Sequence, residues 1–310
     1  PRCNINISNY MKETALTIAV NKNKSEIVSL LISNPKFDPV ESRLDYAFYI
    51  SQGEISKLLI SHTKPDVNFK VFIKQNSDLA SFETTLIHAV KSNDILKIGL
   101  ILNHESFDPI KSQSKLAVFY AAELGFLDIF RQLLPLVNND VNISLEKNNS
   151  LLIVAVKNHR ENIINEIINN DSFSSNKSHL LDAFIETFGY KPSIQNNNNK
   201  TFSWTGNNNN NNYGYGRQPS KEKVFVESMT FIYSYDSMHD HCIDFTKLLP
   251  NGKSFFTSIN YNFENIDIVI RFLLENGAQP DMPDSDGVYP LQQAIKLNSS
   301  VFVRLLLQTK

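Results

Sequence analysis

The stretch "ETALTIAVNKNKSEIVSLLISNPKFDPV", residues 13–40, decides the fold because an altered copy of it occurs later in the chain. That copy is "ETTLIHAVKSNDILKIGLILNHESFDPI", residues 83–110. "NSLLIVAVKNHRENIINEIINNDSF" (149–173) and "GVYPLQQAIKLNSSVFVRLLLQ" (287–308) follow the same order of apolar, small and turn residues. Self-similarity at a period of roughly 30 residues is typical of solenoids and other repeat architectures.

Each unit is predicted to form two short helices that are joined by a tight break. The first helix ends near a small residue, which lets the second helix approach closely. The second helix carries a wide apolar face, for example Ile27, Val28, Leu30 and Leu31. One pair cannot bury that face alone, so neighbouring pairs are expected to stack. The small residues are Ala19, Ala47, Ala89, Ala121, Ala155, Ala183, Ser258 and Ala294.

The break after the first helix has its own signature. Asn23, Asn93, Gly125 and Asn298 each stand four positions after the small residue. Gly and Asn tolerate the left-handed conformation that ends many helices. We therefore expect the first helix to end there.

Composition excludes several classes of protein. The chain has 310 residues, of which 42% are hydrophobic, and its formal net charge is −2. Such a balance gives no overall attraction to nucleic acids or acidic membranes. The two cysteines exclude a disulfide framework, and no apolar run is long enough to span a bilayer. The expected location is a reducing one, the cytoplasm, with the nucleus left open.

The repeated residues resemble the ankyrin repeat family. "ETALTIA" (13–19) and "VYPLQQA" (288–294) look like its first motif, and "SEIVSLLIS" (25–33) and "VIRFLLENGAQPD" (269–281) look like its second. "PDVN" (65–68) and "DVN" (140–142) look like the turn that ends a unit. The resemblance implies an all-α solenoid of stacked helix-turn-helix units with projecting hairpin loops. Glycine, which the family pattern uses often, is scarce here, with 10 in the chain.

The expected organisation has three parts. Residues 1–188 form about five and a half repeats, residues 189–223 form an Asn-rich insertion inside a repeat, and residues 224–310 form the remaining repeats. The insertion has little apolar content and no helical period, so we expect it to be disordered. The first and last units look incomplete, which suggests a fragment of a longer array.

The resemblance also implies a function, which is protein binding on the concave surface of loops and first helices. In this family the positions two or three residues after the small residue face that surface. A stripe of Lys, Asn and Tyr there suits an acidic or hydrogen-bonding partner. The alternative is an ordinary solvated face in a chain rich in Lys and Asn. The candidate residues are Asn21, Lys22, Tyr49, Lys91, Glu123, Lys157, Asn158, Tyr261 and Lys296, with Tyr10, Arg43, Asp284 and Asp286 in exposed loops.

The best candidate for metal chemistry is "MHDHCID", residues 238–244. His239, His241 and Cys242 are potential zinc ligands. In the repeat register, however, the segment beginning at Cys242 replaces an ordinary turn, and no second Cys/His pair occurs at finger-like spacing. No nucleotide-binding or hydrolase motif occurs either. We therefore expect no catalysis, no metal, no cofactor and no small-molecule substrate.

Three functions compete. The preferred one is a scaffold that binds a partner protein, without a membrane role. The second is nucleic-acid binding through the insertion, which offers aromatic rings at Trp204 and Tyr213 and positive charge at Arg217. The third is the regulatory array of an enzyme whose catalytic domain lies outside this sequence.

Overall fold

The computed structural model describes residues 3–73, 81–145, 149–174, 180–186, 229–230, 232–234, 236, 243–249, 251–259 and 266–308. The chain divides into two compact units, Pro1–Val141 and Asn142–Lys310. The predicted insertion, residues 189–223, lies outside the described residues, so its disorder stays a prediction.

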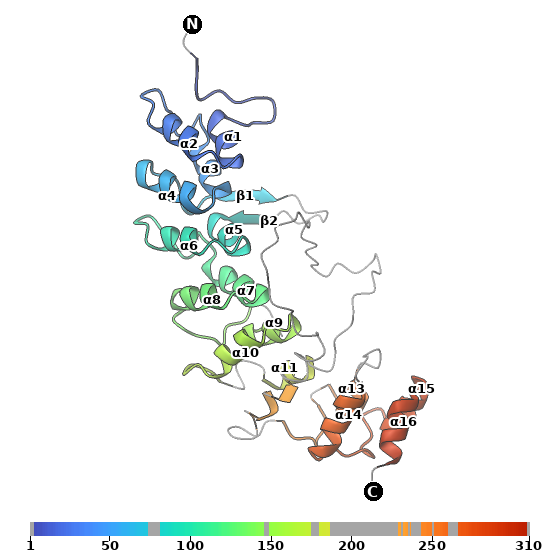
Figure 1. Cartoon of the computed structure of the whole chain (residues 1–310). Coiled ribbons are helices and arrows are strands. Elements are labelled where there is room, and N and C mark those ends of the chain that lie inside the picture. Colours follow the sequence, from blue (N-terminus) through green and yellow to red (C-terminus); the bar gives the residue numbers. More distant parts are fainter. Residues whose placement is uncertain are drawn as a thin grey trace. The chain divides into compact units, whose positions relative to one another are not determined.

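The first unit is a stack of helix pairs in two layers (Figure 1). The pairs are α1 (Ala15–Asn21) with α2 (Ser25–Ile32), α3 (Leu44–Ile50) with α4 (Gly53–His62), α5 (Thr85–Lys91) with α6 (Ile95–Leu102), and α7 (Ser114–Leu124) with α8 (Leu127–Leu133). The short 3₁₀ helix η1 (Leu134–Val137) follows α8. First helices contact first helices (α1 with α3, α3 with α5, α5 with α7), and second helices contact second helices (α2 with α4, α4 with α6).

A two-stranded antiparallel sheet interrupts this unit before α5. Strand β1 (Lys70–Ile73) pairs with β2 (Ser81–Thr84). Figure 1 shows this hairpin pointing away from the second-helix layer. The hairpin lies between Ala47 and Ala89, which are therefore farther apart in sequence than the other consecutive small residues of the first unit.

The second unit continues the same plan. It contains α9 (Leu151–Lys157), α10 (Glu161–Ile168), α11 (Leu180–Glu186), α13 (Phe255–Ser258), α14 (Ile266–Glu275), α15 (Pro290–Lys296) and α16 (Ser300–Leu307). Contacts join α9 to α10 and α11, α13 to α14 and α15, and α16 to α14 and α15. Packed aromatic rings fill the middle of this unit, where Phe184 and Tyr233 contact Phe245 and Phe272. The predicted all-α repeat architecture is confirmed.

Local caps explain why the first helices begin and end where they do. The side chains of Thr14, Thr84, Ser150 and Ser254 each accept a hydrogen bond from a backbone N–H three residues later. The four predicted helix ends are confirmed, because Asn23, Asn93, Gly125 and Asn298 have positive φ angles of 52°, 54°, 80° and 55°. His159, with φ 55°, occupies the same place after α9.

The caps also correct one position in the repeat register. Each cap stands five residues before its small residue, as Ser150 stands before Ala155. Counting from the cap Ser254 therefore puts Ile259 in that place, one residue after the Ser258 that the sequence suggested. Ile259 is buried, so at this position of the repeat a larger apolar residue stands in place of the small one.

Asparagines at the ends of the turns tie one repeat to the next. The Asn6 amide donates to the Lys36 carbonyl oxygen (2.8 Å), and its oxygen accepts from Asp38 N (3.1 Å) and Ser42 Oγ (2.7 Å). The same three contacts join Asn68 to Ser106, Asp108 and Ser112. This recurring clamp is the physical reason for asparagine at the end of the turn motif.

The first helix pair departs from the sequence-based expectation. Of the predicted apolar face of α2, Val28 is buried, but Ile27 is 49% exposed and Leu30 is 73% exposed.

Among the residues that the structure describes, no helix is long and apolar enough to cross a membrane.

Candidate partner-binding surface

The hairpin of the first unit presents an aromatic pair to solvent. Phe72 in β1 lies directly opposite Phe82 in β2, with ring centroids 5.6 Å apart in an edge-to-face arrangement. Each of these two side chains is 54% exposed. Successive residues of a strand point to opposite faces, so the exposed Lys70 shares the face of Phe72. We call Lys70, Phe72 and Phe82 the hairpin face.

The opposite side of the hairpin is fixed to the helices by a polar network. Val71 pairs with Glu83, and Glu83 is buried. The Tyr49 hydroxyl at the end of α3 donates to Glu83 Oε1 (3.0 Å), and Lys91 Nζ of α5 lies 2.6 Å from Glu83 Oε2. Lys91 Nζ also lies 4.4 Å from the centroid of the Tyr120 ring. The network thus anchors β2 to three consecutive first helices.

Tyr49 corrects one of the sequence-based site predictions. It was expected on the exposed face as a binding anchor, but the structure buries it. The centroid of its ring lies 4.4 Å from the centroid of the His88 ring, and the ring stacks on that of Tyr46. Burial and the Glu83 carboxylate both raise the pKa of Tyr49, so the hydroxyl stays protonated and remains a donor. Tyr49 therefore holds the hairpin from its buried side, through Glu83.

A buried lysine supports the helix that carries Tyr49. Lys97 is fully buried in α6, and its ammonium donates to the carbonyl oxygens of Phe48 (2.6 Å), Tyr49 (2.8 Å) and Ser51 (2.8 Å). These carbonyls belong to the C-terminal end of α3. The last carbonyls of a helix have no N–H donor within the helix, and the helix dipole is negative there. Burial lowers the pKa of Lys97 to about 7.

The reason for this lysine lies in how α3 ends. The residue four positions after the small residue is left-handed at Asn23, Asn93, Gly125 and His159, but the residue in that place after α3, Ser51, is extended, with φ −68° and ψ 158°. Lys97 donates to the carbonyl oxygens at this end of α3. The third residue of the other second helices is apolar: Ile27, Ile55, Ile129, Ile163, Ile268 and Phe302.

The turn before α6 supplies a second contact to the connection between α3 and α4. The Asp94 carboxylate caps α6 by accepting from Lys97 N (2.9 Å), and its other oxygen accepts from Gly53 N (2.9 Å) at the start of α4. Gly53 itself has φ 51°. The start of α6 thus provides both an acceptor, Asp94, and a donor, Lys97, for the α3–α4 connection. Sequence reasoning missed Lys97, although a lysine at an otherwise apolar repeat position was a visible signal.

The remaining candidates of the first unit differ in exposure. Asn21, Lys22 and the loop residue Tyr10 are exposed. Arg43 is half-buried, with its guanidinium 4.5 Å from the Tyr46 ring centroid. Glu123, like Lys91 of the network, is half-buried. Lys22, which follows α1, is therefore one of the exposed cations of the first unit.

In the second unit, Lys157 and Lys296 are exposed and Asn158 is half-buried. The Asn158 amide donates to the Val154 carbonyl oxygen (2.9 Å), so this side chain closes the end of its own helix. Tyr261 lies outside the described residues, as do His239, His241 and Cys242. Within the described residues, no group of three or more His, Cys, Asp or Glu side chains is placed to hold a metal ion.

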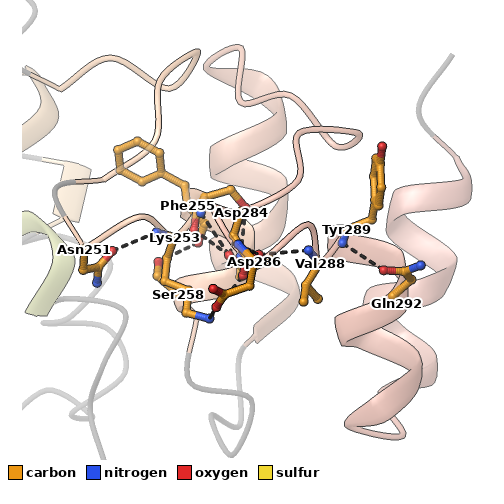
Figure 2. A network of polar contacts seen from close by, with 11 residues as sticks. Asn251, Lys253, Phe255, Ser258, Asp284, Asp286, Val288, Tyr289 and Gln292 are labelled. Carbon is orange, nitrogen blue, oxygen red and sulfur yellow. Dashed lines mark hydrogen bonds and ion pairs between the residues drawn. The ribbon is translucent and has the colours of Figure 1, made fainter.

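Asp284 is a second correction. It was expected to be exposed, but its side chain is buried in the loop before α15. Figure 2 shows its polar contacts with Lys253 and with the backbone at Val288. One oxygen accepts from Val288 N (2.9 Å) and Asp286 N (3.1 Å), and the other lies 3.1 Å from Lys253 Nζ. The hydrogen bond from Val288 is the main reason that the pKa of Asp284 is lowered. Asp286 is exposed, 3.7 Å from Lys253 Nζ.

Solved structures with similar folds are ankyrin repeat proteins. An ankyrin repeat domain from Acinetobacter baumannii AYE is 18% identical, with a TM-score of 0.47 and coverage of 72% of this chain and 95% of that one. The ankyrin repeat domain of Bcl-3, a member of the IkappaB family, is 13% identical, with a TM-score of 0.37 and coverage of 95% and 98%. The ankyrin repeat protein EF0377 is 15% identical, with a TM-score of 0.33 and coverage of 96% and 98%. No protein-family model and no curated protein matches the sequence.

Proposed function

We propose that this array of ankyrin-type helix pairs is a protein-binding module, without catalysis of its own, that holds its partner on the hairpin face. The observation that carries the proposal is the exposed pair Phe72 and Phe82, fixed edge to face on a hairpin whose other side is anchored. The wider surface includes Lys22 on the first-helix side of the same unit.

The chemistry of this face favours a protein ligand. Aromatic side chains are enriched at the centres of protein interfaces, where a few of them carry most of the binding energy. Aromatic side chains contribute more to the binding free energy when they are held in place before binding, because less conformational entropy is lost. The contacts of Glu83 with Tyr49 and Lys91 supply that rigidity.

The exposed charge beside the aromatic pair defines the partner more closely. Lys70 lies on the face of Phe72 and is exposed and positive, whereas the Glu83 carboxylate on the other face of the hairpin is buried and already paired with Lys91. Electrostatic complementarity therefore favours a negatively charged ligand. The proposed partner is a protein segment that presents an aromatic or aliphatic side chain between Asp or Glu residues.

Selection from a displayed random-peptide library on the purified chain tests this proposal. Enriched peptides are expected to combine carboxylates with a large apolar residue. Phe72→Ala and Phe82→Ala should each weaken their binding by about tenfold or more, as for interface anchors. Leu30→Ala is the matched control, because Leu30 is an exposed apolar residue in the second-helix layer. Equal binding by the wild type and a Phe72/Phe82 double variant would show that the hairpin face is not the site.

The nucleic-acid alternative depends on the insertion, which lies outside the described residues. It is tested by a gel shift with single-stranded RNA at low and moderate salt, where binding through Lys and Arg weakens as salt rises.

A further inference from the structure

The backbone of β1 has an edge that faces away from β2. Residues that lie opposite each other in an antiparallel pair alternate between hydrogen-bonded and non-hydrogen-bonded positions. Thr85 N donates to the Phe69 carbonyl oxygen (3.0 Å), so the pair of Phe69 and Thr85 is a hydrogen-bonded one. Counting along the register from it, Val71 also bonds to β2. Lys70 and Phe72, in contrast, direct their backbone N–H and C=O groups to the outer edge.

The loops on either side of the hairpin do not supply a third strand. Residues 34–43 before α3 and residues 103–113 before α7 are all described, and they form turns without a strand. In each turn an Asp carboxylate, of Asp38 or Asp108, accepts from the backbone N–H groups two and three residues later. Such side-chain caps fold the chain into a compact turn. Among the residues that the structure describes, β1 therefore pairs with β2 alone.

Compact turns beside the hairpin leave room along β1. The preceding loop that does form a strand-like bridge lies before α1, where Ser8 pairs with Thr14. It is two helix pairs away from the hairpin, which corresponds to roughly 16–20 Å because packed helices lie about 8–10 Å apart. A neighbouring strand needs only about 5 Å. The spacing of the repeats is therefore compatible with one more strand on this side.

The outer edge of β1 is more open than that of β2. On β2 the backbone of Thr84 faces outward in the same register, but Thr84 is fully buried and its hydroxyl donates to the Ser112 carbonyl oxygen (2.8 Å). On β1 both outward residues, Lys70 and Phe72, are exposed. The exposed backbone groups of an edge strand are a template on which another chain can pair.

We propose that the partner adds to β1 as a third, antiparallel strand. This inference rests on the proposed function, because it uses the same hairpin face and specifies the form of the ligand that binds there. Main-chain hydrogen bonds to Lys70 and Phe72 supply affinity, and the side chains of the hairpin face supply specificity. Antiparallel pairs are more common than parallel pairs and slightly more stable per residue.

The alternation of side chains along a strand fixes the sequence that the partner must carry. Residues two positions apart in the added strand lie on the face of Phe72 and Lys70. A large apolar residue then packs beside Phe72, and a carboxylate lies beside the Lys70 ammonium. Because the strands are antiparallel, the partner reads an apolar residue, any residue, and then Asp or Glu. Proline is excluded from the first and third of these positions, since it has no N–H to donate.

A scan of backbone N-methylation along a bound peptide tests strand addition. The probe is the tightest synthetic peptide from the random-peptide selection whose binding falls with Phe72→Ala. Methylation at the apolar or the acidic position removes a hydrogen bond to β1 and should weaken binding by about tenfold or more. Methylation at the position between them, whose N–H points away from β1, should change binding by less than about threefold. A loss that recurs every second residue is the expected result.

Two substitutions at Lys70 test the same edge from the side of the chain. Lys70→Ala and Lys70→Pro both lose the ammonium, but only the proline variant loses the outward N–H. Lys70 is the first residue of β1, a position in which an edge strand tolerates proline. Lys70→Pro should therefore bind the peptide about tenfold more weakly than Lys70→Ala. Hydrogen exchange of the β2 amides reports whether the hairpin is intact, and the methylation scan decides the question if Lys70→Pro disturbs it.

The outcomes separate this inference from the proposed function. Peptides that depend on Phe72 but respond equally to methylation at every position would overturn strand addition and leave the hairpin face as the binding site. Peptides that bind without regard to Phe72 would overturn both. Sedimentation velocity without peptide examines another occupant: a dimer that Lys70→Pro dissociates would overturn the proposed partner, because a second copy of the chain then fills the edge.

Discussion

The ammonium of Lys97 lies 2.8 Å from the backbone carbonyl oxygen of Tyr49, and the hydroxyl of that same tyrosine donates to Glu83. A buried lysine in a second helix is thus connected, through one residue, to the strand that supports the hairpin face. The end of helix α3 and the hairpin are thus parts of one arrangement.

Replacing Lys97 by methionine should lower the free energy of unfolding by about 2 kcal/mol. The carbonyl oxygens of Tyr49 and Ser51 lose their donor, at about 1–3 kcal/mol each, while removal of a buried ammonium offsets part of that cost. Urea denaturation measures the change. Ile163→Met, at the same position of α10, is the matched control and should cost about 1 kcal/mol or less. Equal losses in the two variants would contradict a capping role for Lys97.

Stability should depend on pH through Lys97. Burial lowers its pKa from the ordinary value of 10.5 to about 7, although Asp94 acts in the opposite direction. Between these values the unfolded chain binds a proton that the folded chain does not, so the unfolding free energy rises with pH. The advantage of the wild type over Lys97→Met should therefore grow from about pH 7 to about pH 10. A constant or shrinking difference would show that Lys97 remains charged in the folded state.

Tyr49→Phe should cost about 2 kcal/mol, because it removes a hydrogen bond to a buried carboxylate. The neighbouring Tyr46→Phe provides the control, since Tyr46 is only half-buried. Hydrogen exchange of the β2 amides should accelerate in the Tyr49 variant alone. Unchanged exchange would mean that the hairpin is held without the Tyr49 hydroxyl.

Asn68→Ala should destabilise the first unit by about 2 kcal/mol, since it removes the clamp on the loop at Ser106, Asp108 and Ser112. Asn103→Ala is the comparison, because the exposed Asn103 side chain bonds only within its own helix region, to the Gly99 carbonyl oxygen. Denaturant unfolding of the two variants is the measurement. A loss at Asn103 as large as that at Asn68 would refute the clamp.

Asp284→Asn should lower the melting temperature of the second unit, because it removes the negative charge that pairs with Lys253. Asp286→Asn should have little effect, since Asp286 is exposed and its contact with Lys253 is longer. Calorimetry compares the two variants directly. The reverse order of melting temperatures would show that the exposed pair matters more.

Several features of the fold were predictable because they depend on neighbours in sequence. The apolar spacing of the helices, and the left-handed ends at Asn23 and Asn93, follow from the local preferences of the backbone. The candidate binding site was harder to predict from the sequence. The hairpin strands, "KVFI" and "SFET", are short, and their alternation is visible only once their pairing is known.

The sequence by itself therefore determined the repeated helix pair and where its first helices end, because caps and periodicity act within a few residues. Only the tertiary structure decided that Tyr49 and Asp284 are buried, and that Phe72 and Phe82 face solvent together. Those outcomes depend on groups supplied from distant segments, such as the Lys97 ammonium and the Glu83 carboxylate. The same residue type can anchor a core or a partner, and its neighbours in space decide which.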